Sequence, residues 1–206
     1  MLSGREVERV VNYLEPTRRA MEERILNAAG EMLAERGAAG LTMRALAERV
    51  GCSTTVFYDR FGNKEGLLEA LLVEGFSRLW DAERQAEVES DPLRRLRSLG
   101  HAYWRTATQH PNYYKAMFGG ALPDYEPSAR AKEAGERTFR VLVDAVAACM
   151  ERGALIRDDP VRVATLLWAA LHGLAHLHLQ GLLPVEDVDS VLDWVLSQLI
   201  SGLSPK

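Results

Sequence analysis

Cysteine is nearly absent from this chain of 206 residues, which contains only Cys52 and Cys149. The two lie far apart and neither has a neighbour at metal-ligand spacing, so neither a disulfide framework nor a cysteine-based metal site is expected. A secretion signal is also missing from the first residues, which mix acidic and basic side chains and contain no apolar core of the necessary length. These absences favour reduced thiols and a cytoplasmic location.

Long uncharged apolar runs are scarce as well, with one exception. Residues 163–185 carry no formal charge and are long enough to cross a bilayer. The same stretch contains three histidines, a glutamine, two glycines and a proline, all of which are unfavourable in lipid. We therefore interpret it as a helix buried in a protein interface, and we expect no membrane partner.

An excess of basic charge is absent too. The chain has 25 Lys and Arg against 29 Asp and Glu, a formal net charge of −4, which excludes a polycation that coats nucleic acid without specificity. A local basic surface is still compatible with this total. The hydrophobic fraction of 47% and the charged fraction of 26% are those of a folded soluble protein. The length suits one ordinary domain, or a small module joined to a larger one.

Strand patterns do not occur, whereas apolar residues recur at helical spacing along nearly the whole chain. This periodicity predicts an all-α protein with an N-terminal three-helix module at 1–66 and a larger C-terminal helical bundle at 67–206. Before residue 17 the pattern fits either an extra helix or an arm. Later helices are expected at about 42–50, 53–61, 64 into the eighties, 92–109, 128–152, 160–180 and 185–201, with a loop at 118–127.

Two short helices separated by a tight glycine-containing turn form the sequence pattern of a helix-turn-helix. Thr42 and Ser53 are expected to cap these two helices. The second helix begins with hydroxyl-bearing residues, which can bond to phosphates and base edges in a major groove. Tyr58 can donate to a phosphate, Arg60 adds positive charge, and Lys64 opens the next helix, where N–H groups also favour a phosphate. Residues 36–64 carry a net charge of +3. The alternative is a helical hairpin whose Ser and Thr serve only as caps.

The segment from Arg24 to Phe76 resembles the DNA-binding domain of TetR-family transcriptional regulators. The resemblance is carried by the paired alanines of the first helix and by Gly37, Thr42, Leu46, Ala47, Gly51, Ser53, Tyr58, Phe61, Lys64, Glu65 and Leu67. It implies that DNA contacts come mainly from the starts of three helices. With Arg60 added for its charge, the expected DNA-binding residues are Thr42, Arg44, Ser53, Thr54, Thr55, Tyr58, Arg60 and Lys64.

Two positions depart from the family pattern. Asp59 is acidic where the family often has histidine or another non-acidic residue. It would repel phosphate unless it accepts a hydrogen bond from a cytosine amine or pairs with Arg60. Gly66 stands near the start of the following helix, where glycine costs about 0.5–1 kcal/mol relative to alanine.

Aromatic residues gather in the second half of the chain. Core packing is the simpler interpretation for each of them, but ligand pockets favour aromatic walls with a few polar groups. The segments HAYWRTATQHPNYYKAMF and LLWAALHGLAHL resemble the WHG type of TetR ligand-binding domain, with Trp168, His172 and Gly173 at the matching positions. The expected ligand-binding residues are Tyr103, Trp104, Tyr114, Met117, Phe118, Trp168 and His172, with Arg105 and His110 as further polar candidates.

His172 and His176 have the i, i+4 spacing that can hold a metal. Because no acid or cysteine accompanies them, a buried structural role, or ligand lining by His172, is favoured over a metal site. We expect no metal, no cofactor and no catalytic residue. A hydrolase using His172 would lack a nucleophile elbow, a phosphate loop and paired carboxylates, and a purely protein-binding adaptor leaves Tyr58 and Lys64 unexplained.

The last two helices carry more apolar residues than one helix face needs. A two-fold four-helix interface, which TetR-like proteins use, would bury them. The resemblance therefore implies a homodimeric transcriptional regulator, a repressor rather than an activator. A partly apolar small molecule would release it from a palindromic double-stranded DNA operator. The helix that starts at Lys64 would transmit the change from the bundle to the DNA-binding module.

Overall fold

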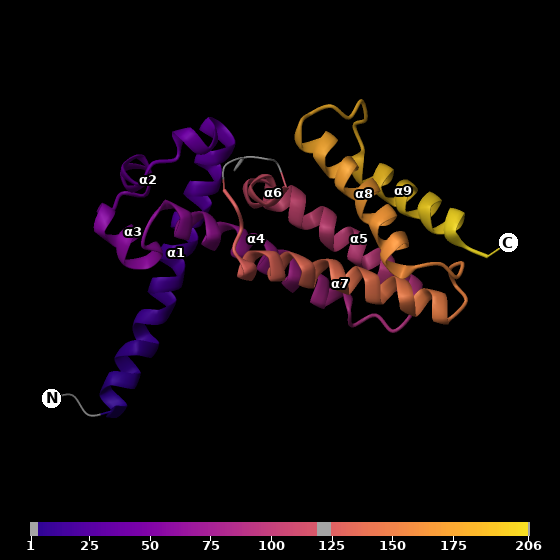
Figure 1. Ribbon diagram of the computed structural model, residues 1–206, viewed down its shortest axis with the longest axis horizontal. Helices are drawn as coiled ribbons and strands as arrows, with labels where there is room; N and C mark the ends of the chain where they lie inside the picture. Colours follow the sequence, from indigo (N-terminus) through magenta and orange to yellow (C-terminus); the bar gives the residue numbers. More distant parts are fainter. Residues whose placement is uncertain (1–3, 119–124, 206) are drawn as a thin grey trace. The chain divides into compact units, whose positions relative to one another are not determined.

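The structure is a computed structural model that describes residues 4–118 and 125–205, with side chains described from Pro16 onward. Within these ranges it contains nine helices and no strand, which confirms the all-α prediction. The helices are α1 (Gly4–Gly40), α2 (Met43–Val50), α3 (Thr54–Phe61), α4 (Lys64–Ala86), α5 (Pro92–Gln109), α6 (Pro111–Phe118), α7 (Ala129–Glu151), α8 (Pro160–Leu179) and α9 (Val188–Leu203) (Figure 1). None of them, over the described ranges, is both long and apolar enough to cross a membrane.

The chain divides into two compact units. The first comprises Met1–Leu72 and Lys115–Glu126, and the second comprises Val73–Tyr114 and Pro127–Lys206. Helices α4 and α6 each contribute residues to both units. The assignment of Lys115–Glu126 to the first unit has no local sequence signal, because it depends on packing between segments distant in the chain.

In the first unit, α1 is helical from Gly4, before the first apolar stripe that the sequence reveals. It is interrupted near its end at Gly37, whose φ of 66° and ψ of −175° are not helical. Helix α2 begins after Thr42, whose hydroxyl accepts a hydrogen bond from the Ala45 N–H group at 3.2 Å. It ends at Gly51 in the left-handed conformation, with φ of 76°. These glycine and threonine signals explain why the sequence predicts the helix boundaries well.

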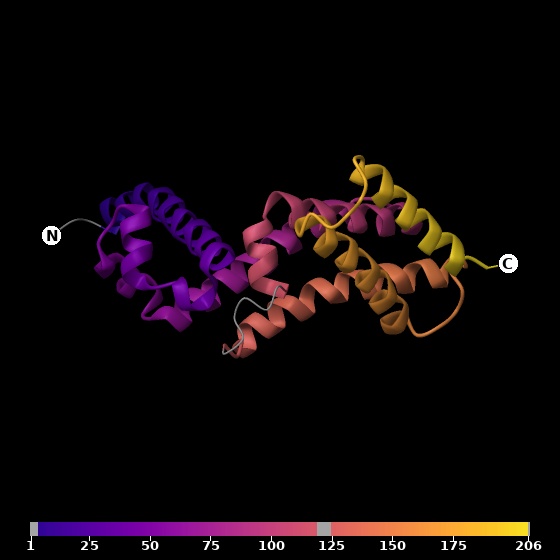
Figure 2. The same cartoon turned by 90° about the horizontal axis from the view of Figure 1, so that it is seen from above.

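The core of the first unit joins α1, α2, α3 and the start of α4. It is formed by side chains that are almost completely buried, and the largest of these are Ile25, Met32, Leu41, Leu46, Phe57, Leu67 and Leu71. All of these except Leu41, which lies between α1 and α2, come from the apolar stripes of their helices, and burying Phe57 leaves the opposite face of α3 exposed. Figures 1 and 2 show α2 and α3 beside α1 from two directions.

Helix α4 starts at a junction that requires glycine. The side chain of Asn63 accepts a hydrogen bond from the Gly66 N–H group at 2.8 Å, which caps the helix. A Cβ atom on residue 66 would overlap the backbone carbonyl of Phe61. The sequence argument that a better helix former is missing at Gly66 is therefore corrected, because the close approach of the preceding chain leaves no room for one.

The second unit is a bundle in which α5, α7, α8 and α9 surround an aliphatic core. One buried group of its residues is Ala86, Leu96, Leu99, Val141, Ala145, Val146, Cys149, Met150, Leu155, Val163, Ala164, Leu167, Ile200 and Leu203. Helices α8 and α9 lie side by side in both ribbon views (Figures 1 and 2). The N–H group of Ile156 donates to the Leu203 carbonyl at 2.7 Å, which ties the end of α9 to the chain after α7.

Candidate functional site

The second short helix, α3, presents its first residues to solvent. Ser53 takes the N-cap conformation, but its hydroxyl makes no capping hydrogen bond, contrary to the sequence expectation. Ser53, Thr54 and Thr55 are all exposed, and none of their hydroxyls is hydrogen-bonded to a described residue. The side chain of Tyr58, one turn later, is 53% exposed. Three hydroxyls and a phenol therefore remain free to bond with a partner at the start of this helix.

The neighbouring Phe57 explains the orientation of α3. Its ring is completely buried in the first unit, whereas Thr54, Thr55 and Tyr58 of the same helix are exposed. Asp59 is exposed on the same helix, and its neighbour Arg60 pairs with Glu22 of α1 at 3.1 Å. The possible Asp59–Arg60 pair is thus replaced by an ion pair that connects α3 to α1.

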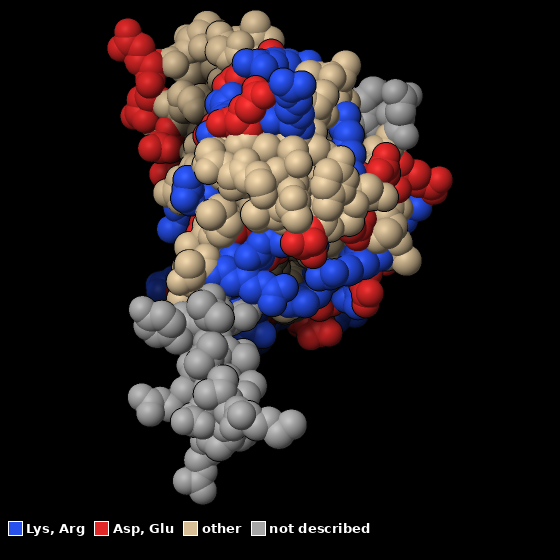
Figure 3. Space-filling view, turned by 90° about the vertical axis from the view of Figure 1, so that its left-hand side faces the viewer, with Lys and Arg blue, Asp and Glu red and all other residues tan. Residues whose placement is uncertain are grey.

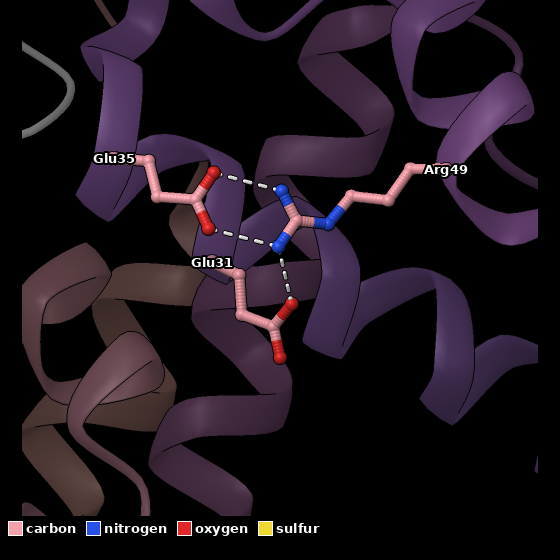
Figure 4. A network of polar contacts seen from close by, with 3 residues as sticks. All are labelled: Glu31, Glu35 and Arg49. Carbon is pink, nitrogen blue, oxygen red and sulfur yellow. Dashed lines mark hydrogen bonds and ion pairs between the residues drawn. The ribbon is translucent and has the colours of Figure 1, made fainter.

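Arg49 of α2 is held by two glutamates of α1 (Figure 4). Its guanidinium donates to both oxygens of Glu35 at 2.8 Å and to Glu31 at 2.8 Å. The hydrogen bonds from Arg49 lower the pKa of Glu35, and those to Glu35 and Glu31 raise the pKa of Arg49. This bidentate arrangement joins α1 to α2 and occupies the guanidinium.

Two further basic residues of the segment, Arg44 and Lys64, are also engaged within the first unit. Arg44 is highly exposed and pairs with Glu48 one turn later, at 3.2 Å. The Lys64 ammonium group donates to the Ala38 carbonyl at 2.6 Å, near the end of α1. The face in Figure 3 shows Lys and Arg in several groups, interspersed with Asp and Glu and divided by a band of uncharged side chains.

These ion pairs reduce the effective positive charge of the helix-turn-helix segment. Residues 36–64 carry a net charge of +3, but Glu22, Glu31 and Glu35 lie outside that range and neutralise two of its arginines. The sequence window could not reveal this, since the partners are on a different helix. Attraction to a polyanion therefore depends less on net charge and more on donors that are correctly placed.

The second unit contains a partly buried polar cluster, which we call the tyrosine–histidine cluster and which consists of Tyr103, Tyr114, Trp168 and His172. The hydroxyls of Tyr103 and Tyr114 each lie 2.9 Å from Nδ1 of His172. Tyr114 also donates to the His172 carbonyl at 3.2 Å. The Trp168 and His172 ring centroids are 5.6 Å apart. Four of the seven expected ligand-binding residues, which are distant in the sequence, are therefore brought together.

Burial controls the protonation of this cluster. Desolvation raises the pKa values of the Tyr103 and Tyr114 hydroxyls, which therefore stay protonated at neutral pH. Desolvation, and then the nearby His176, lowers the pKa of His172, so the neutral imidazole is favoured. The cluster offers neutral donors and acceptors, with no formal charge on these side chains.

A carboxyl group that sequence inspection missed lies in the same unit. Glu83 of α4 is only 7% exposed, and its Oε2 atom has no hydrogen-bond partner among the described residues. Burial, and secondarily the charge of Glu87, raises the pKa of Glu83 to about 9. Its position between buried Leu79 and Ala86 on one helix face is the signal that could have revealed it.

Three further residues, Trp104, Met117 and Phe118, complete the set of expected ligand-binding residues. Trp104 donates from Nε1 to Asp189 at 3.2 Å and packs against His178, with ring centroids 5.0 Å apart. Met117 and Phe118 belong to the part of α6 that is assigned to the first unit. His110 packs edge-on against Tyr113. In the described part of the chain, no group of three or more His, Cys, Asp or Glu side chains could hold a metal ion.

Comparison with known families matches both parts of the chain. The family model described as bacterial regulatory proteins, tetR family, matches residues 25–71. A second model, described as tetracyclin repressor-like, C-terminal domain, matches residues 96–199, which is half of the chain. The WHG type expected from the sequence is a finer assignment than this match supports.

Curated relatives are transcriptional regulators of the same kind. An HTH-type transcriptional regulator of Mycobacterium tuberculosis is 27% identical over 148 residues, which are 70% of this chain and 63% of that protein. The chain thus spans less than two thirds of the length of these mycobacterial relatives. The uncharacterized HTH-type transcriptional regulator YvkB of Bacillus subtilis is 23% identical over 188 residues, 90% of this chain and 98% of that protein.

Solved structures share the fold over nearly the whole chain. A protein of unknown function from Rhodococcus sp. RHA1 is 28% identical, with a TM-score of 0.77 and coverage of 90% of this chain and 96% of that one. AibR, in complex with isovaleryl coenzyme A and operator DNA, has a TM-score of 0.73 at 18% identity, covering 87% and 98%. From its exposed α3, its all-helical fold and both family matches, we conclude that this chain belongs to the TetR family of helix-turn-helix transcriptional regulators.

Proposed function

We propose that this protein is a homodimeric repressor that a small molecule releases from a palindromic DNA operator. The observation that carries the proposal is the start of α3, where Ser53, Thr54, Thr55 and Tyr58 are exposed and their hydroxyls have no partner among the described residues. A short helix of this kind enters a major groove with its first residues against base edges and phosphates. Acting on DNA, the protein would function in the cytoplasm.

Each proposed DNA contact has a chemical role. Ser53, Thr54 and Thr55 would bond to phosphates or base edges, and Tyr58 would donate to a phosphate. Thr42 and Arg44 would contact the backbone from the start of α2. Arg60 and Lys64 would support the contact at the two ends of the α3–α4 turn. For Lys64 this requires the ammonium group to exchange the Ala38 carbonyl for a phosphate.

The effector is proposed to bind in the second unit, at the tyrosine–histidine cluster. Its hydroxyls and neutral imidazole suit a partly apolar molecule with one or two polar groups. Trp168, His172 and Gly173 would then be the defining positions of a WHG-type domain. Trp104, Met117 and Phe118 stay part of the prediction as further ligand contacts, although they are not in the cluster.

Release from DNA is proposed to proceed through α4, which begins at Lys64 and contributes residues to both units. In a homodimer, two copies of α3 must lie about 34–36 Å apart to contact successive major grooves. An effector that favours a different spacing lowers DNA affinity, and by linkage DNA lowers the effector affinity by the same factor.

The test is a gel shift with DNA from upstream of the protein's own gene. We expect specific binding that Tyr58→Phe and Lys64→Ala weaken while both variants stay folded and dimeric. Arg140→Ala, an exposed substitution in the second unit, is the matched charge control and should bind normally. In the wild type, log affinity should fall steeply with log salt, and Lys64→Ala should reduce that slope by about one. Failure to retain any fragment in a genomic pull-down would refute the proposal.

A further inference from the structure

A groove of about 330 Å³ lies between α4 and α7 in the second unit. Its lining residues are Val73, Phe76, Ser77 and Trp80 from α4 with Arg130, Glu133, Ala134 and Arg137 from α7. The volume is at the lower end of the range for small-molecule sites. None of these residues belongs to the tyrosine–histidine cluster or to the proposed DNA contacts, so the groove needs a separate explanation.

The apolar side of the groove is aromatic. Phe76 and Trp80 are one turn apart on α4 and both are half-buried. A Cβ atom on Gly135 of α7 would lie only 3.0 Å from Cζ of Phe76. The absence of a side chain at Gly135 therefore allows the Phe76 ring to approach the α7 backbone, which fixes one wall. The two rings offer a flat surface to the apolar body of a small molecule.

The polar side of the groove is positioned by stacking. The guanidinium carbon of Arg137 lies 3.4 Å from the centroid of the Trp80 ring, at van der Waals contact over its face. A stacked guanidinium keeps its N–H groups in its own plane, where they can still form two parallel hydrogen bonds to a carboxylate. Arg137 is thus held in place before any ligand arrives.

Charge selects the class of ligand. Arg130 and Arg137 are exposed, and neither makes an ion pair with a described residue. Glu133 is the single acid of the lining, so the three charged side chains leave a net charge of +1. One negative charge on the ligand would balance the groove, whereas a polyphosphate would meet repulsion from Glu133.

We propose that this groove binds a small organic monocarboxylate. The apolar body lies against Phe76 and Trp80, and the carboxylate accepts hydrogen bonds from Arg137 and Arg130. The site is separate from the effector site proposed above and does not depend on DNA binding. The site is defined by the stacked guanidinium of Arg137, by an aromatic wall and by a net charge of +1 that one carboxylate would neutralise.

The experiment follows the indole N–H signal of Trp80 by NMR in the full-length protein, with the signal assigned by Trp80→Phe. Hexanoate and benzoate are the probes, and hexanamide and benzamide are their neutral counterparts. We expect the acids to shift the Trp80 signal at concentrations where the amides do not. Equal shifts from acid and amide, or no shift up to about 10 mM acid, a concentration that would occupy about nine tenths of a site with a Kd of about 1 mM, would overturn the proposal.

Variants separate the groove from general charge effects. Arg137→Ala and Arg130→Ala should each weaken acid binding about tenfold, as expected for the loss of one charge-assisted hydrogen bond. Glu133→Gln should strengthen it, and Arg137→Lys should weaken it because lysine neither stacks nor bonds through two parallel N–H groups. Arg140→Ala, an exposed arginine of the same helix outside the groove, is the matched control. A loss with Arg140→Ala equal to that with Arg137→Ala would refute a specific site.

Discussion

Glu83 places a carboxyl group inside the second unit, where an apolar side chain would satisfy the periodicity of α4. It is 7% exposed, and burial, with the charge of Glu87 as a second cause, raises its pKa to about 9 from a usual 4.5. Between these two pH values the folded protein holds a proton that the unfolded chain has released. As far as Glu83 alone is concerned, the free energy of unfolding is therefore highest below pH 4.5 and declines as the pH rises toward 9.

Replacing Glu83 with glutamine removes this proton linkage while preserving size and shape. Glu83→Gln should increase the free energy of unfolding by up to about 3 kcal/mol at pH 7, with almost no effect near pH 4. The measurement is urea unfolding at a series of pH values. Glu136→Gln, an exposed glutamate of α7, is the control and should leave the profile unchanged. An equal stabilisation by Glu83→Gln at pH 4 and pH 8 would contradict this account.

The ion-pair partners of the arginines could not be predicted from the sequence. Arg44, Arg49 and Arg60 all contribute to the basic count of the helix-turn-helix, and their charge alone is visible in the sequence. In the structure, Arg49 and Arg60 pair with glutamates of α1, a helix far from them in the chain. Such pairs depend on how helices cross, which no local pattern encodes. Thr42 and Ser53 were both expected to cap helices, but only Thr42 makes the bond.

At the scale of whole elements the sequence was more informative. The predicted helices at 92–109, 128–152 and 160–180 correspond to α5 (Pro92–Gln109), α7 (Ala129–Glu151) and α8 (Pro160–Leu179). Aspartate and proline mark the starts of α5 and α8 clearly: Asp91 and Asp159 cap these two helices, and each is followed by proline. Apolar periodicity and the residues that cap helix ends are local features of the sequence, so they predict helices without knowledge of the fold. The groove between α4 and α7 is not local and could not be found this way.

The junction between α3 and α4 gives a prediction at this scale. Although alanine is the better helix former, Gly66→Ala should destabilise the protein by about 1–3 kcal/mol, the usual cost of overpacking. The added Cβ overlaps the Phe61 carbonyl, so α4 would have to shift against α3. Thermal unfolding monitored by circular dichroism measures the effect.

The control for this substitution is another helical glycine with open space around it. Apart from its chain neighbours and the backbone of its own helical turn, no atom lies within 4 Å of a Cβ built on Gly202 of α9, so Gly202→Ala should be neutral or stabilising by up to about 1 kcal/mol. If Gly66→Ala proved as stable as Gly202→Ala, the close approach between the Phe61 backbone and the start of α4 would be disproved.

For the whole molecule, α8 and α9 carry large apolar side chains that are exposed to solvent. On α8 and α9, the side chains of Leu166, Leu177 and Trp194 are 50%, 42% and 63% exposed. Large apolar side chains gathered on adjacent helices are unusual on a monomer surface and typical of an interface. The uncharged stretch 163–185 contains two of these leucines, so the feature that first suggested a membrane span is better explained by pairing of subunits.

The proposed homodimer can be tested on this surface directly. Trp194→Glu and Leu166→Glu should each convert the dimer to a monomer, because a buried aromatic anchor is commonly worth at least about 2 kcal/mol and an unpaired charge at its place adds a desolvation cost. Sedimentation velocity measures the mass in solution. Val88→Glu is the matched control, since Val88 is 86% exposed but lies after α4 and outside α8 and α9.

The same variants connect assembly with DNA binding. A monomer contacts only one half-site, so it loses the contribution of the second recognition helix and should bind a palindromic operator far more weakly than the Val88→Glu dimer. Circular dichroism should show that both charged variants remain helical, since neither side chain belongs to the buried core. A wild-type protein that sediments as a monomer, or charged variants that remain dimeric, would require a different interface and would leave α8 and α9 without their proposed partner.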